Sequence, residues 1–255
     1  MSNISGISNA SYSDYGSFAS GKKINSAADG AAELSIIEKE DTQTRGLNAG
    51  ANNIQSAKDM LNVSDGALGS ISDYLQRIRE LAVQASNTAT VSDSDRANMQ
   101  MEVDQLKQGI SDVANYTSFN TKPLLDGSNP TFSIATDSNG NTMTVNGANA
   151  TLDALGIADF DLTGDFNIDD IDKAIDNVSS QRSDAGVKSN ALEYAYNYNT
   201  SAALYSTGAK SRLEDLDFAE AISEKKKQET LQEYALFAQK KKAEEEKQKI
   251  NVLFG

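Results

Sequence analysis

The residues best suited to chemistry in this sequence are the acidic side chains of the stretch 159–170. Asp159, Asp161 and Asp170 stand at positions 1, 3 and 12 of a loop that has Gly164 at position 6 and Asn167 at position 9. Calcium-binding loops place oxygen ligands at these positions and use a glycine at the sixth for a sharp turn. The spacing therefore raises calcium binding as a hypothesis.

Two departures from the calcium-loop pattern weaken this hypothesis. Thr163 stands where Asp or Asn is preferred, and Asp170 stands where the pattern has a bidentate Glu. The later acids also suit the first turn of a helix, where the helix dipole favours carboxylates. Calcium binding by Asp159, Asp161 and Asp170 is thus the lesser interpretation, and we expect neither a metal nor a cofactor.

The composition excludes several classes of function. The 255 residues include no Cys, His or Trp, and the formal net charge is −14. Thiol nucleophiles, histidine bases and the usual zinc sites are therefore absent, and we expect no enzyme. The acidic balance argues against a nucleic-acid partner. No apolar stretch reaches the ~18 residues that span a membrane, and Met1–Ser20 lacks the features of a cleavable signal peptide.

A long amphipathic helix is the main element that the sequence predicts. The apolar positions of its heptad seam are spaced three and four apart: Ile54, Ala57, Leu61, Leu68, Ile71, Leu75, Ile78, Ala82 and Ala85. Such a seam is typical of a coiled coil or a long helical bundle. Ser26–Asp29 has the pattern of a capping box, so we expect the helix to run from there to about Asn87, over roughly 90 Å.

The remaining elements follow from caps and from changes of period. Ser92–Asp95 predicts the cap of a second, antiparallel helix whose seam runs from Met99 to Val113. Residues 131–148 alternate around a polar turn and predict a β-hairpin that lies against the helices. A return helix is predicted over 167–213 and a poorly amphipathic one over 224–249, whereas residues 1–21 are too weakly periodic to assign.

A second, mixed face of the long helix carries Arg77, Leu81 and Gln84 at helical spacing, outside the seam. Two explanations fit this ridge. Leu81 either packs against a third helix of the bundle or stands exposed as part of an interaction surface. From the residues alone, packing is the better explanation.

Several motifs in order resemble those of the bacterial flagellins. They are Ser20–Asp29, Leu75–Asn87, Asp93–Arg96, Phe119–Asn120 with Leu124–Gly127, and Arg212–Asp215. The resemblance implies a mainly α protein, an elongated antiparallel helical bundle with one small hairpin. It also implies a structural subunit of the extracellular flagellar filament that contributes to motility. Its implied partners are other flagellin subunits, an export chaperone and the flagellar export apparatus, which passes the chain out without signal cleavage.

The family pattern also implies a division into segments. Residues 1–25 would be a shortened terminal segment, 26–127 the N-terminal stem, 128–166 a short variable region with the hairpin, 167–223 the C-terminal stem helix and 224–255 the terminal helix. The segment before Ser20–Asp29 is shorter than flagellins usually have, and 224–255 carries Lys and Glu triplets where they are mostly small, apolar or amide. We therefore expect weak self-polymerisation.

The same resemblance implies a binding partner for the ridge. The flagellin positions that match Arg77, Leu81 and Glu102 are contacted by the vertebrate Toll-like receptor 5, a receptor of innate immunity. The receptor surface implied here comprises Gln76, Arg77, Glu80, Leu81, Gln84 and Glu102. On this basis we expect Leu81 to be exposed as part of the receptor surface, and not to pack against a third helix.

Two further functions remain as alternatives. The altered ends are compatible with a secreted, non-polymerising relative of flagellin that acts on a host or partner surface. A hook–filament junction protein shares the stem plan but is disfavoured by the flagellin-specific motifs.

Overall fold

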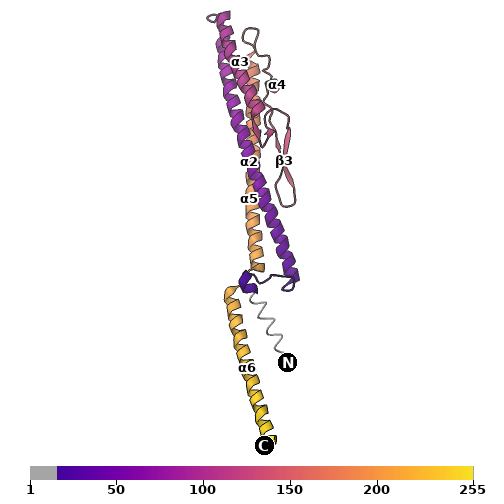
Figure 1. Cartoon of the computed structure of the whole chain (residues 1–255). Coiled ribbons are helices and arrows are strands. Elements are labelled where there is room, and N and C mark those ends of the chain that lie inside the picture. Colours follow the sequence, from indigo (N-terminus) through magenta and orange to yellow (C-terminus); the bar gives the residue numbers. More distant parts are fainter. Residues whose placement is uncertain (1–15, 255) are drawn as a thin grey trace. The chain divides into compact units, whose positions relative to one another are not determined.

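The computed structural model of this chain describes residues 16–254 and separates into two compact units. One unit comprises Met1–Thr44 with Leu204–Gly255, and the other comprises Arg45–Ala203. The elements are α2 (Ala31–Ala85), α3 (Asp93–Tyr116), β1 (Ser118–Phe119), β2 (Lys122–Pro123), β3 (Thr131–Ala135), β4 (Thr142–Asn146), α4 (Leu152–Leu155), α5 (Ile168–Glu214) and α6 (Phe218–Phe254) (Figure 1). The mainly helical fold with one small antiparallel hairpin is confirmed. Most of the weakly periodic segment 1–21 lies outside the described residues.

The start of the long helix differs from the prediction, because α2 begins at Ala31 and not at Ser26. The carboxylate of Asp29 accepts hydrogen bonds from the backbone N–H groups of Asn25 (3.0 Å) and Ser26 (2.8 Å) and from the Ser26 hydroxyl. These bonds hold the pKa of Asp29 below its usual value, with the Asn25 bond contributing most. The capping-type contacts thus close a separate turn, and the helix starts after Gly30.

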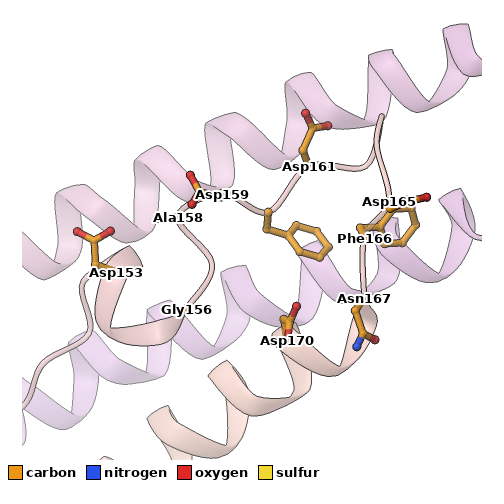
Figure 2. Close-up of a pocket in the computed structure, with 10 residues that line it drawn as sticks. Asp153, Gly156, Ala158, Asp159, Asp161, Asp165, Phe166, Asn167 and Asp170 are labelled. Carbon is orange, nitrogen blue, oxygen red and sulfur yellow. The ribbon is translucent and has the colours of Figure 1, made fainter.

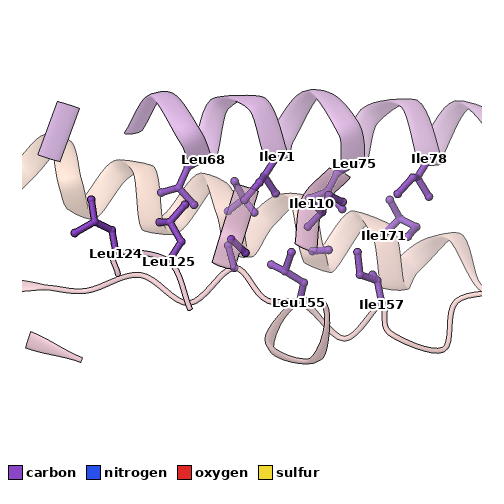
Figure 3. Close-up of a cluster of buried hydrophobic side chains, with 14 of the residues drawn as sticks. Leu68, Ile71, Leu75, Ile78, Ile110, Leu124, Leu125, Leu155, Ile157 and Ile171 are labelled. Carbon is purple, nitrogen blue, oxygen red and sulfur yellow. The ribbon is translucent and has the colours of Figure 1, made fainter. Parts of the chain in front are cut away.

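Antiparallel helices form the core of the Arg45–Ala203 unit. Ion pairs join Asp65 to Arg182 (2.8 Å) and Arg79 to Asp172 (2.6 Å), so the numbering on α5 falls as that on α2 rises. The predicted seam of α2 is buried along with Val103 and Ile110 of α3. Figure 3 shows Leu68, Ile71, Leu75 and Ile78 of α2 projecting into this cluster from one side. The seam prediction is confirmed.

The helix α3 begins as its sequence predicts. The Ser92 hydroxyl accepts a hydrogen bond from the backbone N–H of Asp95 (3.2 Å), and the Asp95 carboxylate accepts one from the backbone N–H of Ser92 (2.9 Å). Both bonds of a capping box are therefore present. After α3 the chain makes a tight two-stranded turn, β1–β2, in which Asn120 and Thr121 have positive φ angles.

The hairpin β3–β4 packs against both long helices, as expected. Asn53 of α2 donates a hydrogen bond from Nδ2 to the carbonyl oxygen of Ala135 (3.1 Å), and Asn199 of α5 donates one to that of Thr136 (2.5 Å). Gly50 of α2 lies beneath the same turn, where an added Cβ would meet the Thr136 oxygen at 2.6 Å. A glycine is required there because the hairpin backbone approaches the helix so closely.

The other unit joins the N-terminal part of the chain to the end of α5. The backbone N–H of Lys23 donates to the Glu214 carbonyl (2.8 Å), and that of Leu216 donates to the Gly21 carbonyl (2.9 Å). Glu214 is buried and pairs with Lys22. This two-way backbone pairing fixes the point at which α5 ends and α6 begins.

Candidate functional site

The predicted ridge contains an ion-pair cluster that bridges α2 and α3. Nε of Arg77 donates to Oε1 of Glu102 at 2.7 Å, and another guanidinium nitrogen of Arg77 donates to Oε2 of Glu80 at 3.0 Å. The two carboxylates raise the pKa of Arg77, with the Glu102 hydrogen bond contributing most. The structure thus brings Glu102 of α3 to Arg77 and Glu80, which are one turn apart on α2.

Leu81 does not belong to the exposed part of this ridge. Its side chain is only 3% exposed and it is a member of the main hydrophobic cluster. The expectation that Leu81 stands on the surface is therefore wrong in the isolated chain, and the packing explanation is correct. The heptad seam marks the centre of the buried stripe, but a helix packed by several elements buries a wider face.

Gln76 and Gln84 are exposed on α2, as predicted, and flank the charged cluster. Sequence reasoning missed Val83, which is exposed and lies three residues after Glu80 on the same side of α2. It also missed Met101, which is exposed next to Glu102. A signal was available for Val83, because it falls outside the seam at helical spacing from Gln76 and Glu80.

The acidic loop 159–170 lies around an open cavity of about 320 Å³. Figure 2 shows the side chains of Asp159, Asp161 and Asp170 at separate places around it. Among residues 16–254, no three acidic side chains come close enough together to hold a metal ion. The ligand set of the calcium hypothesis is therefore not assembled.

Local contacts explain why this loop is not arranged around a cation. Asp161 accepts hydrogen bonds from the backbone N–H and the hydroxyl of Thr163, both at 2.7 Å. These bonds, the backbone one first, lower the pKa of Asp161 and turn its carboxylate back onto the loop. The Lys107 ammonium of α3 donates to the carbonyl oxygens of Ala158 (2.6 Å) and Phe160 (3.2 Å). A positive charge of the chain itself thus ties the loop to the bundle.

The terminal helix α6 presents a different kind of surface. Leu231, Tyr234, Leu236 and Phe237 are between 57% and 70% exposed. Exposed large apolar side chains grouped on one element are typical of an interaction site. None of the described helices is both long and apolar enough to cross a membrane.

Comparison with protein families identifies relatives over both ends of the chain. A model of the bacterial flagellin N-terminal helical region matches residues 1–130. A model of the bacterial flagellin C-terminal helical region matches residues 168–253. The unmatched stretch between them contains the β3–β4 hairpin and the acidic loop up to Asn167.

Individual relatives agree with the family models. Flagellin of Bacillus subtilis is 33% identical over 262 residues, covering 88% of this chain and 86% of the relative. A flagellar filament 33 kDa core protein of Treponema phagedenis is 34% identical, covering 83% of this chain and 81% of the relative. The crystal structure of Bacillus cereus flagellin superimposes with a TM-score of 0.52 at 31% identity, covering 58% of this chain and 88% of that one.

Proposed function

This chain belongs to the bacterial flagellins, the structural subunits of the flagellar filament, and from that premise we propose that it also carries a receptor-recognition surface around Arg77 and Glu102. The chain is exported through the flagellar secretion apparatus with the help of an export chaperone. It then assembles with other flagellin subunits outside the cell. The receptor is the vertebrate Toll-like receptor 5.

The observation that supports the receptor proposal is the Arg77–Glu102 pair. It joins α2 to α3 at 2.7 Å and leaves both side chains nearly half exposed. Arginine on a rigid element is a common anchor of protein interfaces, because its guanidinium is planar and makes several directed hydrogen bonds. Glu80 holds the same guanidinium from a second side, so the charged group is already oriented before a partner arrives.

The buried position of Leu81 changes which side chain provides the apolar contact of this surface. Met101 of α3 is exposed next to Glu102 and takes that role in our proposal. Leu81 contributes indirectly, because its burial holds α2 in place.

The matched control for this surface lies two residues away on the same helix. Arg79 pairs with Asp172 at 2.6 Å, and its side chain is 47% exposed against 48% for Arg77. The two arginines therefore differ mainly in the face that they occupy. We expect Arg77→Ala to weaken binding of the receptor ectodomain by about tenfold or more, while Arg79→Ala leaves binding nearly unchanged.

The measurement is the affinity of the immobilised ectodomain for each folded variant, with thermal melting recorded in parallel. Equal loss of binding for both arginine variants would mean that net charge, and not this surface, determines the affinity. Normal binding by Arg77→Ala would overturn the receptor proposal while leaving the filament role intact.

A further inference from the structure

The middle of α6 lies at Ala235 and Leu236, and a block of lysines on one side of it is matched by a block of glutamates on the other. Lys225–Lys227 precede this midpoint by as many residues as Glu244–Glu246 follow it. Glu229 and Lys242 are also equally far from it on the two sides. A helix with this arrangement is complementary to a second copy of itself that runs in the opposite direction.

Apolar side chains occupy the stretch from Leu231 to Ala238, between Lys225–Lys227 and Lys240–Lys242. Leu231, Tyr234 and Ala238 are spaced three and four apart, and the same spacing reaches Lys227 on one side and Lys241 and Glu245 on the other. We call this set of positions the α6 heptad face. Leu231 and Tyr234 are 60% and 70% exposed, so the face has no partner within the described part of the chain. The spacing is that of a two-helix interface.

The opposite side of α6 already has a partner. The ring of Phe18 lies 6.1 Å from that of Phe218 and 5.5 Å from Nζ of Lys225. The half-buried residues between Ala221 and Gln232 are Ala221, Lys225, Gln228 and Gln232, which share one face of the helix. At about 100° per residue, that face points away from the side of Tyr234. Every residue from Glu233 to Lys249 is exposed.

We propose that the α6 helices of two copies of this chain pair in antiparallel orientation through the α6 heptad face. In the register set by the heptad spacing, with the twofold axis at Leu236, Tyr234 of each copy lies against Ala238 of the other and Leu231 lies against the side chain of Lys241. Lys227 of each copy then lies opposite Glu245 of the other, and this contact occurs twice because the pair has twofold symmetry.

Charge determines the direction of pairing. A parallel pair would place Lys225–Lys227 against the same triplet of the second copy, and Glu244–Glu246 likewise. Like charges that face one another across a helix pair are destabilising, whereas the antiparallel pair replaces them by opposite charges. The apolar middle supplies contact area in either direction, so the lysine and glutamate blocks decide between them.

Cysteine cross-linking tests the pairing in the full-length protein, which contains no natural cysteine. Ala235→Cys places the thiol next to the twofold axis, where the two copies come within disulfide range. Ser223→Cys lies on an exposed part of the same helix, but two such positions in an antiparallel pair are ~39 Å apart. A disulfide requires Cα atoms within about 7 Å.

Under mild oxidation we expect Ala235→Cys to form disulfide dimers while Ser223→Cys remains monomeric. Cross-linking of both variants to the same extent would indicate parallel or nonspecific association and would overturn the proposal. Failure of both variants to cross-link, at concentrations where sedimentation velocity shows only monomer, would overturn it as well.

Charge reversal provides the second test in the Ala235→Cys background. Lys227→Glu or Glu245→Lys alone should lower the rate of cross-linking about fivefold, since each replaces two opposite-charge contacts by like-charge ones. The double variant should recover the original rate, and an equimolar mixture of the two single variants should recover somewhat more than half of it, because half of the encounters are between unlike variants. Equal rates for all these proteins would exclude Lys227–Glu245 pairing. Circular dichroism of each variant verifies that the helices are intact.

Discussion

Ile78 and Leu81 lie one helical turn apart on α2 and are both buried in the same hydrophobic cluster. Only Ile78 belongs to the heptad seam. Leu81→Ala should therefore lower the free energy of unfolding by about 2–4 kcal/mol, as should Ile78→Ala, because each leaves a cavity in the core. Thermal or urea unfolding measures both variants. If the Leu81→Ala protein were as stable as the parent, Leu81 would not be part of the buried core.

The close packing of the hairpin on Gly50 leads to a second prediction. A Cβ at this position would lie 2.6 Å from the Thr136 oxygen and 2.9 Å from Nδ2 of Asn199. Gly50→Ala must displace the hairpin turn and weaken the Asn199–Thr136 hydrogen bond, so we expect a loss of about 1–3 kcal/mol in unfolding free energy.

Gly66 is the matched control, because it lies in the same helix with nothing within 4 Å of its added Cβ. Gly66→Ala should stabilise the protein by about 1 kcal/mol, since alanine favours the helix over the unfolded chain. If both alanine variants stabilised the protein equally, the hairpin would not pack on Gly50.

The sequence predicted the helices well because their apolar spacing repeats over many turns. The seam from Ile54 to Ala85, the cap at Ser92 and the hairpin turn all depend on local patterns, and each is present. The start of α2 was misplaced because Asp29 makes the same backbone contacts in an isolated turn as it would in a capping box.

Long-range packing accounts for what the sequence did not reveal at the candidate site. Leu155, Ile157 and Leu162 lie in the region expected to be variable, yet they are buried in the main cluster. With these residues and α3 and α5 all packing around it, α2 buries more than its seam, and Leu81 is included. The Arg77–Glu102 pair depends on the register between α2 and α3, which periodicity does not fix.

Acid should weaken the fold over a defined range of pH. Hydrogen bonds and ion pairs lower the pKa of seven carboxylates: Asp29, Asp95, Asp126, Asp137, Asp161, Asp172 and Glu193. In Asp137 the largest cause is the hydrogen bond from the Asn141 side chain. A lowered native pKa contributes stability above the unfolded value of about 3.9, and this contribution is lost as the pH falls through the native value.

We therefore expect stability to decline below about pH 4 and to change little between about pH 5 and 8, where histidine would titrate but the chain has none. Urea unfolding at several pH values measures this. Asp137→Asn should make the fall of the unfolding free energy at acid pH less steep, because it removes one carboxylate whose pKa is lowered in the folded protein. A steep loss of stability near neutral pH would contradict the assignment.

Hydrogen exchange should differ sharply between α2 and α6. The seam of α2 from Ile54 to Ala85 is buried, so its amides should exchange only by large-scale opening. Residues Glu233–Lys249 of α6 are exposed on all sides, and a single unpacked helix is marginal in water. In dilute protein we expect exchange there at close to random-coil rates. Strong protection in that stretch would mean that Glu233–Lys249 is packed against another part of the protein, contrary to its exposure in the structure.

The charge triplets of α6 lead to the last prediction, which concerns filament formation. Burying Lys240–Lys242 and Glu244–Glu246 between subunits would remove six charged groups from water, which is costly unless each finds a partner. The pure protein should therefore form few long filaments under ordinary seeding, as seen by negative-stain microscopy. Replacing all six residues by glutamine keeps their length and polarity but removes the charge, and should increase both the number and the length of filaments. Abundant filaments from the parent protein, or no gain from the glutamine variant, would show that these charges do not limit assembly.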